Sequence, residues 1–259
     1  LADERFLLCS DGVTSGLEDD EIARALARAD EPAAAARAVV DGALAAGGDL
    51  SPRRLVAAYR RGIFPWYSGD DPILWWSPDP RMVLQVDNFR LHRSLRKTLQ
   101  QFRDNPACEV RIDTAFAQVI THCAQSARRG APGTWIVPSM VKAYTALFEA
   151  GNAHSVETWI DGKLVGGLYC VALGRAVFGE SMFTQGPNAS RIALAALVAL
   201  CRENAITMID CQQNTAHLAS LGAAEMGRAE FAQHVRSVRE CTNPVWVFPP
   251  LYWKHILSA

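Results

Sequence analysis

The sequence predicts an α+β protein with a mixed, mostly antiparallel sheet, preceded by a smaller N-terminal domain. Two β-rich runs, 154–160 and 164–172, are joined by Asp161-Gly162, a dipeptide typical of two-residue hairpin turns. A long apolar stretch follows, and then a buried strand at 207–211. The segment 59–81 is too rich in Trp, Pro and Gly for one helix or strand, so we expect a loop that serves function.

Helices in the first half are predicted from composition and capping residues. Alanine-rich stretches favour helices at 21–29 and 33–46. Ser51 is a favourable N-cap for a helix over 52–61, with proline at its first position and glycine after its end. Further helices are expected at 91–102, at 114–128 behind a cap at Asp113, and at 138–150.

The second half alternates strands with helices. Short β-branched runs predict strands at 82–86 and 109–112, and the hairpin continues into 175–184. Asn188 is expected to cap the apolar helix that ends at Cys201, and a last helix is expected at 229–239. Antiparallel strands followed by a helix and a strand make an α+β domain.

This order of helix, hairpin strands, helix and strand is similar to the order in acyltransferases of the GNAT type. The similarity is an analogy that concerns only the order of the secondary-structure elements. The composition changes near residue 80. We therefore expect a small N-terminal domain over 1–80, which includes the aromatic loop, and a GNAT-like catalytic domain over 81–259.

The bulk composition excludes several classes of protein. Of the 259 residues 49% are hydrophobic and 20% charged, and no apolar run reaches the roughly 18–20 residues of a membrane span. Seven scattered cysteines without a CxxC pair indicate reduced thiols in a cytoplasmic protein. The histidine spacings match no metal motif, so we expect neither a metal nor another cofactor. With a net charge of −1, a nucleic-acid partner would need a local basic patch.

The first candidate site lies on the strand at 206–212. Side chains two apart in a strand point the same way, so Asp210 and Gln212 are expected on one face. A carboxylate beside an amide can orient a nucleophile, although Asp210 could equally cap the following turn. By the same rule Phe178, Glu180 and Met182 are expected to share a face, which suits a pocket for an apolar side chain and a cation. The alternative is that Glu180 forms an ion pair on an edge strand and has no functional role.

Two further features bear on the ligand. The loop 185–190 has one glycine and a proline where a CoA-dependent enzyme would carry a glycine-rich phosphate loop, which argues against CoA. A basic run lines one face of the helix at 91–102, and several tryptophans accompany it. Bases stack on aromatic rings, but a solvated basic face and tryptophans in the core are the ordinary explanations. The basic residues are Arg90, Arg93, Arg96 and Lys97.

Ten short motifs occur in one order between Gly47 and Pro249. They are GGDLS, YRRGIFPW, LWWSPDPR, GTWI, AHSVE, GGLY, GESMF, NAS, IDCQ and SLGA. In this series the chain resembles the leucyl/phenylalanyl-tRNA–protein transferases. The resemblance implies an enzyme that moves leucine, phenylalanine or methionine from aminoacyl-tRNA to the N-terminal arginine or lysine of a protein, which marks that protein for degradation.

The resemblance also implies roles for individual residues. It makes Asp210 and Gln212 the catalytic pair and Glu180 a nearby carboxylate. Arg93 and Lys97 match the patch that holds the tRNA acceptor stem, and we add Arg90 and Arg96 from the same basic run. Trp66 and Trp135 resemble residues that hold the terminal adenosine. By the same resemblance, the walls of the pocket for the donor's side chain are Met182, Leu194, Leu197 and Ile209. Leu197 and Val177 stand where the family often has phenylalanine.

Aminolysis of an ester needs no ATP or metal, so placement of the amine should dominate catalysis. We expect Gln212 to contact the amine, Asp210 to polarise and orient Gln212, and Glu180 or Asp210 to receive the acceptor's cationic side chain. Two alternatives are an acyl-CoA-dependent N-acetyltransferase and a non-catalytic tRNA-binding module.

Overall fold

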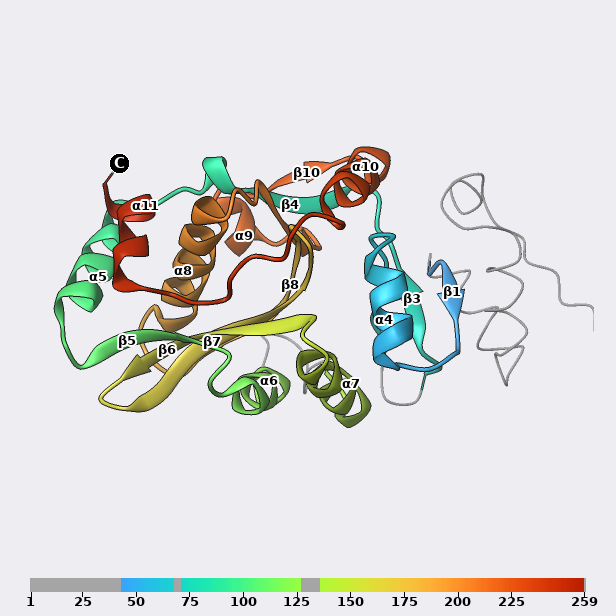
Figure 1. Ribbon diagram of the computed structural model, residues 1–259, viewed down its shortest axis with the longest axis horizontal. Coiled ribbons are helices and arrows are strands. Elements are labelled where there is room, and N and C mark those ends of the chain that lie inside the picture. Colours follow the sequence, from blue (N-terminus) through green and yellow to red (C-terminus); the bar gives the residue numbers. More distant parts are fainter. Residues whose placement is uncertain (1–42, 68–70, 127–135, 259) are drawn as a thin grey trace, which may run out of the picture. The chain divides into compact units, whose positions relative to one another are not determined.

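The computed structural model describes residues 43–67, 71–126 and 136–258 (Figure 1). The chain divides into two compact units between Ser77 and Pro78. The domain boundaries predicted at 1–80 and 81–259 stay a prediction. The helices expected at 21–29 and over most of 33–46 lie outside the described residues.

In its described residues, 43–67 and 71–77, the smaller unit has the helix α4 and a three-stranded antiparallel sheet of order β1-β3-β2. Its elements are α4 (Pro52–Tyr59), β1 (Ala45–Ala46), β2 (Phe64–Pro65) and β3 (Leu74–Trp76). The Ser51 side chain accepts a hydrogen bond from the Arg54 N–H, as its predicted N-cap role requires.

Two expectations for this unit are wrong. The segment at 45–46 is a strand and not the end of a helix, because it pairs with β3 and buries Ala46. The aromatic segment is not all loop, since β2 and β3 pair within it. Leu74 and Trp75 are buried there, so packing of large apolar side chains orders the segment.

The larger unit is built on a seven-stranded sheet of order β10-β4-β9-β8-β7-β6-β5. All neighbours pair antiparallel except β8 and β9, which are parallel. The predicted α+β class and mostly antiparallel sheet are confirmed. The strands are β4 (Arg81–Gln85), β5 (Cys108–Ile112), β6 (Ala153–Ile160), β7 (Lys163–Leu173), β8 (Ala176–Thr184), β9 (Met208–Gln212) and β10 (Ala224–Met226).

Helices cover both faces of this sheet. Figure 1 shows α6 and α7 on one face and α8 on the other. The helices are α5 (Arg93–Asp104), α6 (Phe116–Gln125), α7 (Pro138–Glu149), α8 (Ala189–Glu203), α9 (Ala216–Ser220), α10 (Arg228–Val238) and α11 (Lys254–Leu257), with 3-10 turns η1 (Val86–Asn88) and η2 (Pro250–Trp253).

The main core lies between α8 and the sheet, where α8 is buried on nearly all sides. In the described part of the chain, no helix combines the length and apolar character that a membrane crossing needs.

The predicted hairpin is present, and its turn has the expected chemistry. Asp161 and Gly162 both have positive φ, 50° and 69°, as a primed turn requires. Of the other two predicted caps, the one at Asp113 is wrong and the one at Asn188 is right only in position. Asp113 binds His154 and the Ser155 N–H instead of capping α6, and the Ala115 N–H at that helix start is bound by Glu157.

Asn188 occupies the cap position of α8 but makes no capping hydrogen bond through its side chain, since it adopts a left-handed conformation with φ 60°. The sequence expectations did not include α9, β10, η2 and α11. These elements are short, between three and five residues, and are held by tertiary contacts more than by propensity.

Gly222, in the SLGA motif, is required by the turn that follows α9. Its φ is +102°, and a Cβ atom there would lie 2.1 Å from the Asn88 carbonyl oxygen. We expect Gly222→Ala to lower the free energy of unfolding by about 2–4 kcal/mol, from backbone strain and overpacking together. Gly186→Ala is the matched control, because a Cβ there meets only Val165 at 3.6 Å. Denaturant unfolding measures both, and equal effects for the two variants would contradict the prediction.

Candidate active site

A buried ion pair joins β4 to β9. Arg81 donates from Nε to Asp210 Oδ1 at 2.8 Å and from Nη2 to Oδ2 at 2.6 Å. Their side chains are 0% and 1% exposed. The pairing of Val83 with Asp210 brings the two strands together, and the guanidinium lies 4.6 Å from the centre of the Phe231 ring. Two parallel charge-assisted hydrogen bonds fix the orientation of the carboxylate.

Gln212 ends β9 in an unusual conformation. Its φ is 62°, which L-residues other than Asn and Asp rarely adopt. The register of β4 against β9 shifts here, because Met82 is opposite Gln212 while Val83 is opposite Asp210. Cys211 is therefore the extra residue of a β-bulge. The Gln212 N–H donates to Asp210 Oδ1 at 2.8 Å, which ties the bulge to the ion pair.

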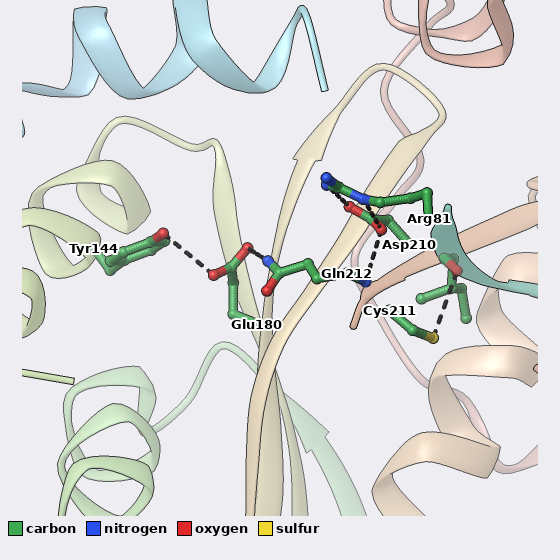
Figure 2. A network of polar contacts seen from close by, with 7 residues as sticks. Arg81, Tyr144, Glu180, Asp210, Cys211 and Gln212 are labelled. Carbon is green, nitrogen blue, oxygen red and sulfur yellow. Dashed lines mark hydrogen bonds and ion pairs between the residues drawn. The ribbon is translucent and has the colours of Figure 1, made fainter. Parts of the chain in front are cut away.

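The Gln212 side chain reaches Glu180 on β8. Nε2 of Gln212 donates to Glu180 Oε1 at 2.8 Å, and the Tyr144 hydroxyl of α7 donates to Oε2 at 3.2 Å. Figure 2 shows Tyr144, Glu180 and Gln212 in a row, with Asp210 and Arg81 beyond them. Gln212 and Glu180 are each 8% exposed. The site is thus a line of polar groups carried by β4, β9, β8 and α7.

The hydrogen bond to Glu180 determines how the amide of Gln212 is turned. An ionised carboxylate only accepts hydrogen bonds, so the amide nitrogen must face Glu180. The carbonyl oxygen Oε1 of Gln212 then points away from Glu180 (Figure 2). That oxygen is an acceptor, and an attacking amine carries N–H groups that it can bind.

Asp210 and Gln212 belong to one line of polar groups, but alternation does not put them on one face as expected, because the extra residue Cys211 leaves them opposite Val83 and Met82, which are neighbours on β4. Asp210 is opposite Phe178, which packs on α10 through Phe231, whereas Cys211 between the two residues packs on the core beneath α8. The expected contact between them is wrong in detail. Asp210 binds the main-chain N–H of Gln212, and the carboxylate at the amide side chain is that of Glu180.

The expected common face of Phe178, Glu180 and Met182 is also wrong. Val171 is opposite Phe178 and Leu168 is opposite Met182, and residues three apart in β7 face opposite sides. The register shifts between Tyr169 and Cys170, so Glu180 is an extra residue in β8. A β-bulge at Glu180 therefore breaks the alternation, which the sequence pattern alone does not reveal.

The four apolar residues expected to form the donor pocket lie at the core between α8 and the sheet. Leu194, Leu197 and Ile209 are fully buried there. Met182 packs against the same cluster and is half-buried. Of the four, only Met182 is partly open to solvent, so Met182 is the member that a ligand can reach.

The basic run divides into different environments. Arg93 and Lys97 lie on α5 and are exposed, while Arg90 is exposed but precedes the helix. Arg96 is half-buried and donates from Nη1 to the Leu257 carbonyl at 3.0 Å, so it holds the end of α11. Arg96 is thus engaged within the protein, which the helical spacing of the run did not indicate.

Of the two tryptophans expected at the adenosine, the structure describes Trp66. Trp66 belongs to the smaller unit, is half-buried, and meets Trp76 edge to face with 5.6 Å between ring centres. The Trp76 indole N–H also donates to the Trp66 carbonyl at 2.6 Å. Trp135 lies outside the described residues.

Cys211 adjoins both candidate residues but is a poor nucleophile. Burial, and to a smaller extent the Asp210 carboxylate, raise the pKa of its thiol to about 12. The thiolate is the reactive form, so an acyl-thioester at Cys211 is disfavoured near neutral pH. Among the described residues no group of three or more His, Cys, Asp or Glu side chains is arranged to hold a metal ion.

Arg81 and Tyr144 were missed by sequence reasoning. Arg81 closes the LWWSPDPR motif and begins a buried strand, and a charged residue at such a place signals a buried partner. Tyr144 sits on α7 among apolar residues, and its sequence context gives no sign of its contact with Glu180.

Comparison with known proteins gives one family for both units. The model described as leucyl/phenylalanyl-tRNA protein transferase matches residues 83–236, and the model of that family's N-terminal domain matches residues 48–79. Proteins named leucyl/phenylalanyl-tRNA–protein transferase are similar in sequence. The protein from Polaromonas sp. is 63% identical over a match that covers 84% of this chain and 86% of that protein. The protein from Albidiferax ferrireducens is 57% identical over a match that covers 84% of this chain and 85% of that protein.

Solved structures show weaker likeness. A GCN5-related N-acetyltransferase from Kribbella flavida matches with a TM-score of 0.35 and 10% identity, over 66% of this chain and 60% of that chain. A ribosomal-protein-alanine N-acetyltransferase from Brucella melitensis matches with a TM-score of 0.33 and 16% identity, over 55% and 99%. Likeness at this level is too weak to carry a functional inference.

Proposed function

The chain belongs to the leucyl/phenylalanyl-tRNA–protein transferase family, and we propose that Gln212 and Glu180 arrange the two substrates of its reaction. The protein is an aminoacyltransferase that moves an aminoacyl group from tRNA to a protein. Its proposed donors are leucyl-, phenylalanyl- and methionyl-tRNA, and its proposed acceptors are proteins that begin with arginine or lysine. Transfer to such proteins would mark them for degradation.

The chemistry is attack of the acceptor's α-amine on the ester carbonyl of the aminoacyl-tRNA. The reference pKa of an α-amine is about 7.7–8.0, so roughly a tenth is neutral at pH 7. An amine needs placement more than it needs a strong base. We assign Gln212 Oε1 to hold an N–H of the attacking amine, because its Nε2 is held by Glu180. This single hydrogen bond is the observation that carries the proposal.

Glu180 is the proposed receptor for the acceptor's cationic side chain. Gln212 and Tyr144, which are both neutral, donate hydrogen bonds to its carboxylate. A guanidinium or ammonium group there would form a charge-assisted hydrogen bond. Asp210 is unsuited to this role, because Arg81 already binds both of its oxygens. Of the two carboxylates expected to receive the acceptor's cationic side chain, Glu180 or Asp210, we therefore propose Glu180.

The donor would be held at its two ends. For the tRNA we propose the exposed Arg93 and Lys97 at the acceptor stem, and Trp66 and Trp135 at the terminal adenosine. For the amino acid we propose the apolar group that comprises Met182, Leu194, Leu197 and Ile209, entered beside Met182. Apolar pockets distinguish side chains that differ by one methylene by only about 1–3 kcal/mol, so isoleucine should be excluded only in part.

The test is a transfer assay with purified components. The full chain is mixed with radiolabelled leucyl-tRNA and peptides that begin with arginine, lysine or alanine, and no nucleotide is added. We expect label in the arginine and lysine peptides alone. Label in none of them contradicts the proposed acceptors, and transfer that needs added acetyl-CoA would favour the N-acetyltransferase alternative. Binding of charged and uncharged tRNA without transfer would favour a non-catalytic tRNA-binding module.

A further inference from the structure

Arg81 holds Asp210 in one orientation inside the larger unit. Its guanidinium binds both carboxylate oxygens and lies against the Phe231 ring. A guanidinium presents a rigid fork that matches a carboxylate, whereas a lysine ammonium is a point charge on a flexible chain. With exposures of 0% and 1%, neither side chain has solvent to replace its partner. The position of the Asp210 carboxylate therefore depends on Arg81.

The fixed carboxylate acts on Gln212 through the main chain. Asp210 Oδ1 accepts a hydrogen bond from Arg81 Nε and another from the Gln212 N–H, each at 2.8 Å. The second bond holds Gln212 at φ 62°, which is uncommon for glutamine. The direction of the Gln212 side chain follows from this conformation, and its Nε2 then meets Glu180.

Asp210 has little room for direct contact with a substrate. With Phe178, Phe231 and His234 it lines a cavity of about 10 Å³, which is close to the space of one water. An amino acid or a peptide terminus does not fit there. The ion pair therefore lies behind the reacting groups, and Gln212 stands between them.

We propose that Arg81 is a positioning residue for aminoacyl transfer, which acts through Asp210 and the main chain to aim the Gln212 carboxamide. The inference rests on the proposed role of Gln212. It adds a residue that touches neither substrate, and it changes Asp210 from a residue that polarises the amide to one that transmits position.

The test compares Arg81→Lys in two backgrounds. Single-turnover transfer of leucine from leucyl-tRNA to an arginine peptide is measured at saturating concentrations of both, for the full chain and for its Gln212→Ala variant. In the first background we expect Arg81→Lys to lower the rate by about 10- to 100-fold, since a misplacement of about 1 Å can cost 100-fold. In the Gln212→Ala background the same substitution should change nothing further.

This pattern separates positioning from general loss of structure. A smaller folded fraction would lower the transfer by the same factor in both backgrounds. Arg202→Lys is the matched control, because Arg202 is half-buried and donates to the Val86 carbonyl at 3.0 Å, away from Gln212. It should keep the wild-type rate constant. A second variant, Arg81→Met with Asp210→Leu, replaces the pair with apolar side chains and should fold but transfer slowly.

The outcomes that overturn the inference are distinct from those that overturn the proposed function. Suppose that Gln212→Ala is slow, but Arg81→Lys or the double variant Arg81→Met with Asp210→Leu transfers at the wild-type rate. The role of Arg81 is then overturned, and the proposed role of Gln212 is not. Equal losses from Arg81→Lys in both backgrounds also overturn the role of Arg81. A wild-type rate for Gln212→Ala overturns the proposed role of Gln212 and the inference with it, and no transfer by the wild-type chain overturns the proposed acceptors first.

Discussion

Replacing Gln212 by alanine is expected to lower the single-turnover rate of leucine transfer by about 100- to 1000-fold, the loss typical when one fixed polar group is removed from a reacting centre. The alanine has no carbonyl oxygen to hold the attacking amine. It also leaves Glu180 without the amide that donates to its Oε1 at 2.8 Å. The measurement is rapid mixing of preformed enzyme and leucyl-tRNA with an arginine peptide.

Two variants show whether the amide itself is responsible. Gln212→Asn keeps a carboxamide and tolerates positive φ, but is one methylene shorter, so it should fold well and still transfer slowly. Gln213→Ala changes the exposed neighbouring glutamine and should transfer at the wild-type rate. A rate for Gln212→Ala close to that of Gln213→Ala would show that the amide does not touch the reaction.

The sequence identified three of the polar residues at the site but not their connections. Alternation predicted Asp210 and Gln212 on one face of β9, and Phe178, Glu180 and Met182 on one face of β8. Neither pattern holds, because β-bulges occur at Cys211 and at Glu180 and each shifts the register by one residue. Bulges are set by pairing with a partner strand, so a pattern within one strand does not contain them. The carboxylate that binds the amide was therefore assigned to the wrong strand.

The fold was predictable where local chemistry and global packing agree. The hairpin turn at Asp161-Gly162 needs two residues of positive φ, and the sequence supplies both. The cap expected at Asp113 failed because a distant residue supplies the acceptor: Glu157 on β6 binds the Ala115 N–H at the start of α6. The capping preferences of the residues around position 113 carry no information about a hydrogen-bond partner more than 40 positions away in the sequence.

The ion pair between Arg81 and Asp210 should matter more for folding than any exposed pair. We expect Asp210→Leu to lower the free energy of unfolding by about 3–5 kcal/mol, because it leaves the Arg81 charge buried without its carboxylate. The Gln212 N–H loses its acceptor in the same substitution. Denaturant unfolding of the full chain, followed by circular dichroism, measures the change.

Burial, and not the ion-pair distance, is the cause that this prediction tests. Arg103 Nε and Asp104 Oδ1 are similarly close, at 2.7 Å, but their side chains are 41% and 63% exposed, so Asp104→Ala should leave the unfolding free energy nearly unchanged. Adding Arg81→Met to Asp210→Leu should restore most of the lost stability, because an apolar pair needs no charge partner. If Asp210→Leu unfolded at the wild-type denaturant concentration, the pair would contribute nothing to the fold. Its retention in a buried strand would then have to be explained by catalysis alone.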